Sequence, residues 1–251
     1  MGRGSVGDGA KERPRKRVNP GPKTRLKSRR HVSAVLLAAG ASNRFGGGKQ
    51  LASLDDHTTL AGRALETLRH STVDSIFLVL GHRSHDVLKS LGPLERRIVV
   101  VTNSRFSEGL SSSLKVGVRA AAPRSDAVVV ALADQPFVTP ELIDDIIDRH
   151  RKTGRAVASV TPDGLITPPM LLDKALFGEV MELQGDLGAK SVVLRHEPFE
   201  RVDVEPDALM DVDTPTDLEV ARERWNLSSG ARALRARRDL GAGSRARAPP
   251  S

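Results

Sequence analysis

Between residues 32 and 162, short apolar runs rich in β-branched residues alternate with segments whose apolar residues recur at helical spacing. Continuous apolar runs are typical of strands buried on both faces, and strands separated by helices form a mostly parallel sheet. The five runs are VSAVLLAAG (32–40), SIFLVLG (75–81), RRIVVVTN (96–103), DAVVVALAD (126–134) and AVASVTP (156–162). They predict an α/β fold of three layers, in which a mostly parallel, twisted sheet carries helices on both faces. Such sheets bind ligands at the carboxyl ends of their strands.

The segments between the runs predict the helices. One helix face collects Leu60, Ala64, Leu65 and Leu68, and another collects Leu114, Val118 and Ala121. Pro140 stands where the first turn of a third helix is expected, a position that favours proline. Further helices are predicted around 85–91 and over 174–185, 188–196 and 217–225.

The 251-residue chain contains no cysteine, which excludes disulfides and thiolate metal sites and favours a reducing, cytoplasmic location. No apolar stretch approaches the roughly 18 residues that a bilayer span needs, and the basic N-terminus lacks the apolar core of a signal peptide. We therefore expect no membrane partner.

Positive charge is concentrated at the two ends of the sequence. The chain carries a net charge of +8, but residues 1–31 and 226–251 are strongly basic, and the part between them carries more acidic than basic residues. We expect a disordered N-terminal extension (1–31), one folded domain (32–225) and a disordered Arg/Ala-rich tail (226–251), with a frayed helix over 231–238. The basic ends are either dispensable extensions or arms for nucleic acid or membrane surfaces. Because the body is acidic, no specific nucleic-acid partner is expected.

A glycine-rich stretch, LLAAGASNRFGGGKQL (36–51), follows the first predicted strand. It is not a Walker A loop, because Asn43 stands where the first glycine belongs and Gln50 where Ser or Thr belongs. It is not a dinucleotide fingerprint either, since Ser42 and Leu51 occupy required glycine positions.

The same stretch brings backbone N–H groups, Arg44 and Lys49 to the end of one strand. Several donors and cations at close range suit a triphosphate. The alternative is a glycine-rich surface turn with a solvated arginine and lysine.

Two other parts of the sequence carry aspartates that could bind a metal ion. Asp134 ends the fourth predicted strand, where it could bind Mg²⁺, a cation that prefers one or two carboxylates plus phosphate oxygens. Alternatively, Asp134 caps a turn before the helix that Pro140 begins. Near the C-terminal end of the body, Asp213 or Thr214 could cap the last helix, and Asp211 or Asp213 could supply a second metal contact.

Four stretches occur in order: LLAAGASNRFGGGKQL, LADQPFVTPELI, LQGDLGAKSVV and DVDTPTDLE. Together they resemble the MobA-like NTP transferases of molybdenum-cofactor biosynthesis over residues 32–225. The LAAG and ADQP elements are most similar to the cytidylyltransferase branch, whereas guanylyltransferases typically carry LAGG. The resemblance implies a Rossmann-like nucleotidyltransferase fold.

The resemblance also implies site residues. It implies that Arg44, Lys49 and Asp134 are catalytic, with Arg44 contacting the phosphates. It also implies that Asp134 and Asp213 bind magnesium. Nucleotide contacts fall to Leu37, Ala38, Ala39, Gly40, Lys49, Asn103, Gly109, Ser111 and Ser112, with Ser113 beside them. Residues 185–190 would lie on the acceptor side. Thr167, Pro168 and Pro169 replace the Gly-His-Pro-like element of relatives, which leaves the acceptor open.

The implied reaction is Mg²⁺-dependent transfer of NMP, with CTP favoured over GTP, to a phosphate acceptor such as molybdopterin, with release of pyrophosphate. A molybdoenzyme is a possible protein partner of such an enzyme. Three alternatives stay open: a sister transferase acting on a sugar phosphate or phospholactate, an oxidoreductase, and a non-catalytic chaperone for the molybdenum cofactor. The seven histidines show no metal-ligand spacing, although His82 and His85 could line the nucleotide site.

Overall fold

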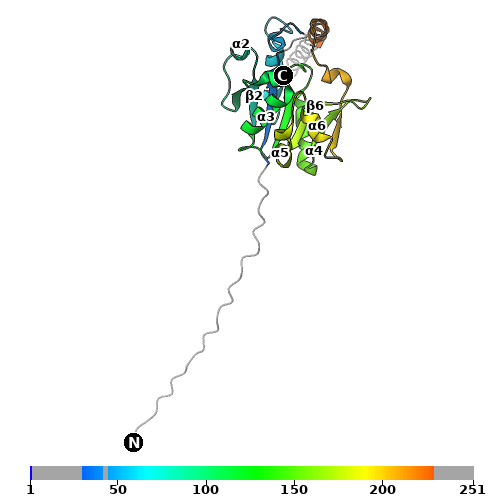
Figure 1. Cartoon of the computed structure of the whole chain (residues 1–251). Coiled ribbons are helices and arrows are strands. Elements are labelled where there is room, and N and C mark those ends of the chain that lie inside the picture. The colour runs from blue at the N-terminus through cyan, green and yellow to red at the C-terminus, as the bar shows by residue number, and fades with distance from the viewer. Residues whose placement is uncertain (2–29, 42–44, 229–251) are drawn as a thin grey trace, which may run out of the picture.

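A computed structural model describes Met1 and residues 30–41 and 45–228 (Figure 1). The predictions for the two basic ends and for Arg44 fall mainly outside these residues. The described part forms a sheet of seven strands in the order β3-β2-β1-β4-β6-β5-β7. The strands are β1 (Val32–Ala38), β2 (Ser75–Leu80), β3 (Ile98–Thr102), β4 (Ala127–Leu132), β5 (Val157–Val160), β6 (Ile166–Asp173) and β7 (Glu200–Asp203).

The sheet is mostly parallel, as predicted. Parallel pairing joins β1 to β2 and β4, β2 to β3, and β5 to β7, whereas β6 runs antiparallel to both of its neighbours. The five predicted runs correspond to β1 through β5. Because β1 to β4 point the same way, the residues that follow them gather at one edge of the sheet, called the carboxyl edge below.

Two strands, β6 and β7, are absent from the sequence prediction. β6 contains Pro168 and Pro169, which cannot donate to a ladder and therefore argue against a central strand. The structure places these prolines where the register between β5 and β6 shifts, and the Ser159 hydroxyl donates to the Pro169 carbonyl at 2.8 Å. β7 has only four residues, of which Val202 alone is buried, so its sequence shows no continuous apolar run.

Helices cover both faces of the sheet, which gives the expected three layers. They are α1 (Leu60–His70), α2 (Ser84–Ser90), α3 (Leu110–Ala121), α4 (Pro140–Thr153), α5 (Phe177–Glu182), α6 (Ala189–Val193) and a last helix over 215–228. Apolar residues of α1 and α4 pack on one face, and those of α3, α5 and α6 pack on the other. The residues predicted to share a face on α1 and α3 are all buried.

The last helix belongs to a separate apolar cluster. Leu218, Ala221 and Trp225 pack against Leu54 and Leu60, which flank the start of α1. The segment 211–214 is thereby held beside the carboxyl edge. No helix within the described ranges is both long and apolar enough to cross a membrane.

Gly117 lets α3 pack close against the sheet. A Cβ atom there would lie 2.4 Å from Cγ1 of Val35 and 2.8 Å from Cγ2 of Val79. Both valines are fully buried and have stiff χ1 angles, so neither can move aside cheaply.

We predict that Gly117→Ala lowers the free energy of unfolding by about 1–3 kcal/mol, the usual cost of overpacking, despite the better helix propensity of alanine. Gly178→Ala is the matched control, because Gly178 lies in α5 and a Cβ atom added there would have no neighbouring atom within 4 Å. It should be neutral or stabilising by up to about 1 kcal/mol. Urea denaturation measures both, and equal effects of the two substitutions would contradict the proposed packing constraint.

Candidate functional site

The glycine-rich stretch forms a tight loop beyond β1. Gly46, Gly47 and Gly48 all have positive φ angles, of 84°, 96° and 68°. Three successive residues with positive φ require glycine, because a residue with a side chain would be strained at each position. The 3₁₀ turn η2 (Lys49–Leu51) follows directly, with Gly48 as its N-cap. The loop thus turns the chain so that Lys49 faces the carboxyl edge.

Lys49 meets two carboxylates that lie far away in the sequence. Its Nζ atom is 2.6 Å from Oδ2 of Asp134 and 2.7 Å from Oδ1 of Asp213. The Lys49 side chain is 14% exposed, Asp134 is 20% exposed and Asp213 is 47% exposed. The sequence-predicted residues Lys49, Asp134 and Asp213 are therefore in direct contact.

Backbone hydrogen bonds fix the positions of the carboxylates. The Val212 N–H donates to the Asp134 carbonyl at 3.0 Å, so the segment 211–213 is anchored to the end of β4. Val212 itself is fully buried. This hydrogen bond brings two segments that lie far apart in the sequence to the same place.

The capping alternatives have different outcomes. Thr139, not Asp134, caps α4, because its side chain accepts from Leu142 N–H. Asp134 is therefore not the N-cap of α4, and its side chain pairs with Lys49. At the last helix, Thr214 Oγ1 accepts from the Asp217 N–H while Asp217 Oδ2 accepts from the Thr214 N–H, a reciprocal capping box. Asp213 is thus left to pair with Lys49.

The charges in this cluster shift one another. Burial alone would lower the pKa of Lys49, but the neighbouring Asp134 and Asp213 outweigh it and hold that pKa above its usual value. The largest effect on the pKa of Asp211 is the loss of hydration of its carboxyl group beside the surrounding protein. The negative charges of Asp134 and Asp213 act in the same direction. Together they raise the pKa of Asp211 to about 6, although a hydrogen bond from Gln135 and the charge of Lys49 oppose the shift.

The donor set fits a magnesium ion that shares its ligands with a phosphate. Asp134 Oδ1 is buried and has no hydrogen-bond partner among the described residues, so it can accept a further ligand. Within the same residues there is no group of three or more His, Asp or Glu side chains that could hold a metal without help. Two carboxylates plus phosphate oxygens match the usual environment of Mg²⁺.

The end of β1 lies directly beside this cluster. Leu37, Ala38 and Ala39 are buried, and the Gly40 carbonyl accepts from Nε2 of Gln50 at 2.8 Å. Sequence reasoning used Gln50 only to exclude a Walker loop and missed its role in holding the loop against the strand. Its position immediately after Lys49 was the available signal. Arg44 lies outside the described residues.

A second cluster of predicted site residues follows β3 and consists of Asn103, Gly109, Ser111 and Ser112. The Asn103 Nδ2 atom donates to the hydroxyls of Ser112 and Ser113 at 2.9 and 3.0 Å, and Asn103 is 2% exposed. Ser111 N–H donates to the Gly185 carbonyl at 3.0 Å. The side chains of Asn103 and Ser112 thus bond within the second cluster rather than to the carboxylates.

Gly109 is the point where that second cluster touches residues 185–190. Its φ is 99°, and a Cβ atom there would lie 2.4 Å from the Gly185 carbonyl oxygen. The predicted nucleotide segment and the predicted acceptor segment are therefore packed together at this glycine.

Gln135 connects the carboxylates to β6. Gln135 is 1% exposed, its amide lowers the pKa of the nearby Asp211, and its Nε2 atom lies 3.5 Å from Oγ1 of Thr167. Sequence analysis did not single out Gln135, although it stands next to Asp134 in the ADQP element. The antiparallel direction of β6 explains the contact, because it brings the start of β6 to the carboxyl ends of the parallel strands.

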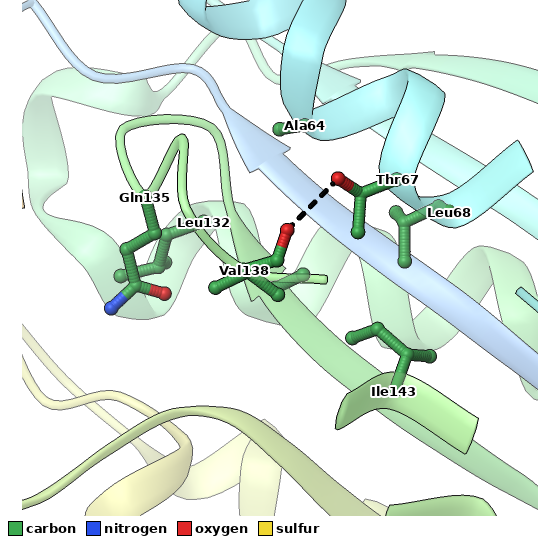
Figure 2. Close-up of a pocket in the computed structure, with 8 residues that line it drawn as sticks. Ala64, Thr67, Leu68, Leu132, Gln135, Val138 and Ile143 are labelled. Atoms are coloured by element: carbon green, nitrogen blue, oxygen red, sulfur yellow. Dashed lines mark hydrogen bonds between the residues drawn. The ribbon is translucent and has the colours of Figure 1, made fainter. Parts of the chain in front are cut away.

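Two cavities of the fold lie beside α1 rather than at Lys49. The one in Figure 2 has a volume of about 10 Å³, space for a single water, beneath the loop that follows β4. Thr67 there donates to the Val138 carbonyl at 3.1 Å, and the Gln135 amide is turned away from Thr67. A larger cavity of about 290 Å³ runs along α1 and includes Arg63, Arg69 and Trp225 among its lining residues. Neither cavity is lined by Lys49, Asp134 or Asp213.

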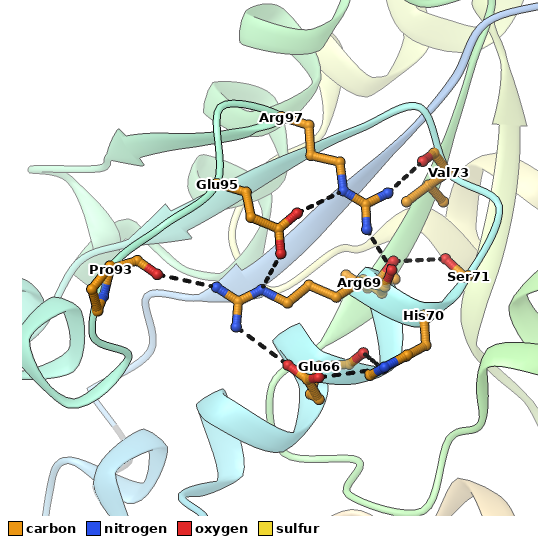
Figure 3. Close-up of polar contacts among 9 residues, drawn as sticks. Glu66, Arg69, His70, Ser71, Val73, Pro93, Glu95 and Arg97 are labelled. Atoms are coloured by element: carbon orange, nitrogen blue, oxygen red, sulfur yellow. Dashed lines mark hydrogen bonds and ion pairs between the residues drawn. The ribbon is translucent and has the colours of Figure 1, made fainter.

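A charged network at the opposite end of the sheet is structural. Arg97 donates to Glu95 at 3.2 Å and to the Val73 carbonyl at 3.1 Å, and Arg69 pairs with Glu66 and Glu95 (Figure 3). These contacts tie α1 to the chain entering β2 and β3.

His82 packs its ring against Phe106, with centroids 5.8 Å apart, and His85 is exposed.

Known proteins resemble this chain along most of its described length. A family model described as the MobA-like NTP transferase domain matches residues 34–200. Nicotine blue oxidoreductase from Paenarthrobacter nicotinovorans is 34% identical over 67% of this chain and 83% of its own length. Molybdenum cofactor cytidylyltransferase from Escherichia coli (strain K12) is 24% identical over 77% of this chain and 97% of its own length.

Among solved structures, Rv0371c from Mycobacterium tuberculosis H37Rv matches with a TM-score of 0.67 and 31% identity, covering 77% of this chain and 98% of its own. Rv0371c has also been solved in complex with manganese, and that structure matches with a TM-score of 0.64 and 30% identity over 77% of this chain and 98% of its own. The family match spans well over half of the chain. The chain therefore belongs to the MobA-like NTP transferase family and, as a member, is a nucleotidyltransferase.

Proposed function

We propose that this enzyme transfers CMP from CTP to the phosphate group of a molybdopterin-type acceptor, in a Mg²⁺-dependent reaction that releases pyrophosphate. The contact of Lys49 with Asp134 and Asp213, beside a glycine loop at the carboxyl edge, is the observation that carries this proposal. The cytidylyltransferase relative and the LAAG and ADQP elements support the choice of base and acceptor.

The nucleotide would lie across the ends of β1 and β3. Backbone groups of residues 37–40 and of the glycine loop would contact the triphosphate, with the cations of Lys49 and Arg44 on its phosphates. The second cluster would face the base and the α-phosphate through the segment that contains Asn103, Gly109, Ser111 and Ser112. Because their side chains bond to one another, Asn103 and Ser112 would act mainly by shaping this segment.

Asp134 and Asp213 would hold the metal ion, and Asp211 would remain beside them, near Gln135. Bound Mg²⁺ would neutralise charge on the phosphate oxygens and so make the α-phosphorus a better electrophile. The manganese complex of Rv0371c supports a divalent cation at a fold of this kind.

The transfer itself needs no covalent protein intermediate. An ionised oxygen of the acceptor phosphate attacks the α-phosphorus of CTP and forms a new P–O bond. The bond from the α-phosphorus to the bridging oxygen breaks, and that oxygen leaves with the electron pair as part of pyrophosphate. Lys49 and Arg44 would orient the phosphates and stabilise the developing charge, which is the main contribution a protein makes to such reactions.

The acceptor would approach from the side of Thr167 and residues 185–190. Thr167 is linked to the carboxylates through Gln135, and residue 185 packs on Gly109. A sugar phosphate or phospholactate would use the same attacking group, so the acceptor is the part of the proposal that most needs direct measurement.

The deciding experiment incubates the purified protein with Mg²⁺, molybdopterin and α-labelled CTP or GTP. We expect label to move from CTP to the pterin, with one pyrophosphate released for each transfer. A non-catalytic chaperone would bind the pterin without releasing pyrophosphate, and transfer only to a sugar phosphate or phospholactate would replace the proposed acceptor.

A redox activity is a second candidate, because the relative at 34% identity is named as an oxidoreductase. A thermal-shift panel with CTP, GTP, ATP and NADPH, each with and without Mg²⁺, separates the two. Ligands that bind the folded state raise its melting temperature. We predict that CTP with Mg²⁺ gives the largest shift, whereas a shift with NADPH alone would favour redox chemistry and contradict the proposed transfer of CMP.

We further predict that Asp134→Asn lowers the rate of CMP transfer by at least about 100-fold, the usual effect of removing one preorganised charge-stabilising group. Circular dichroism should show an unchanged fold. Asp148→Asn is the matched control, because Asp148 is 59% exposed on α4, away from the cluster, and should leave the rate unchanged. Transfer at the parent rate by Asp134→Asn would refute the assigned role.

A further inference from the structure

The Lys49 ammonium occupies the space between the two carboxylates that the proposed function assigns to the metal. Nζ lies within 2.7 Å of an oxygen of each, so one cation pairs with both groups and offsets one of their two negative charges. The low exposure of Lys49 and Asp134 strengthens this attraction, because ion pairs shielded from water are screened less by solvent and salt.

We propose that Lys49 holds the place of the metal ion in the ligand-free enzyme and exchanges the carboxylates for nucleotide phosphates when metal and nucleotide bind together. This inference rests on the proposed function. It predicts that the divalent cation binds weakly alone and tightly with the nucleotide.

Charge explains why the metal alone should bind weakly. A divalent cation that entered between Asp134 and Asp213 would break two short ion pairs and leave a partly buried ammonium next to a double positive charge. Like charges at such a distance repel strongly. A triphosphate changes this balance, because it offers Lys49 new anionic partners and gives the metal additional oxygen ligands.

The local structure allows the lysine to move while its surroundings stay fixed. Gln50 is anchored through its Nε2 atom to the Gly40 carbonyl, which holds the backbone of η2. Asp134 and the 211–214 segment are joined by the hydrogen bond from Val212, and Asp217 ties down the backbone of Asp213 and Thr214. The lysine stem is flexible, so the exchange needs rotation of one side chain and no loop movement.

The test measures Mn²⁺ binding by electron paramagnetic resonance, without nucleotide and with the non-reactive analogue α,β-methylene CTP. For the full-length protein we expect the analogue to tighten Mn²⁺ binding at least about tenfold, within the usual range of coupling between two ligands. For Lys49→Met we expect Mn²⁺ alone to bind at least about tenfold more tightly than to the parent, and the effect of the analogue to shrink.

Lys152→Met is the control. Lys152 is an exposed lysine in the last turn of α4, and its loss makes the same change in net charge. It should leave Mn²⁺ binding as in the parent. A similar gain in both variants would show a general charge effect and overturn the inference.

Amine labelling of the parent protein provides a second measurement that does not depend on a variant. The ion pairs should protect Lys49 from acetic anhydride relative to Lys152. Saturating Mg²⁺ without nucleotide should raise Lys49 acetylation at least about threefold and leave Lys152 unchanged. The inference is overturned if Lys49 labelling does not respond to metal, or if Lys49→Met binds Mn²⁺ no better than the parent.

Different results would overturn the place-holding role of Lys49 and the proposed function. Tight Mn²⁺ binding by the parent protein with no dependence on Lys49 would leave the nucleotidyltransferase proposal intact and overturn the place-holding role. Absence of any binding of the analogue, with or without Mn²⁺, would overturn the proposed function and this inference with it.

Discussion

The ammonium of Lys49 joins three parts of the chain that lie far apart in the sequence. It follows the glycine loop, and its two partners follow β4 and precede the last helix. Two carboxylates so close together would repel one another without a cation between them. Backbone hydrogen bonds hold the two carboxylates in place, and the ammonium of Lys49 supplies the positive charge that offsets their mutual repulsion when no ligand is bound.

Sheet topology explains why this meeting happens at one edge. The parallel strands β1 to β4 deliver Gly40, Asn103 and Asp134 to their carboxyl ends, where ligands of α/β sheets bind. The single antiparallel strand β6 then brings its first residues to the same edge. Thr167 reaches Gln135 for this reason, and the proposed acceptor side and the proposed metal side become neighbours without any long loop.

Apolar periodicity was sufficient to predict β1 to β5 and the buried faces of α1 and α3, because burial on both faces of a sheet leaves continuous apolar runs. It failed for β6, where Pro168 and Pro169 occupy a register shift, and for β7, which is short and largely exposed. Asp134 could be predicted as a ligand candidate from its place after a strand. The role of Gln135 could not, since it depends on a contact with a side chain of another strand, and for Gln50 the only signal was its place after Lys49.

The central claim is that Asp134 and Asp213 form a metal site completed by a nucleotide, and a crystal of the protein grown with Mn²⁺ and α,β-methylene CTP tests it most directly. The account predicts an anomalous-scattering peak between the two carboxylates, bridged to the α-phosphate, with Lys49 turned onto the phosphates. A nucleotide bound elsewhere, or bound here with Lys49 still between Asp134 and Asp213 and the metal absent from both, would contradict it.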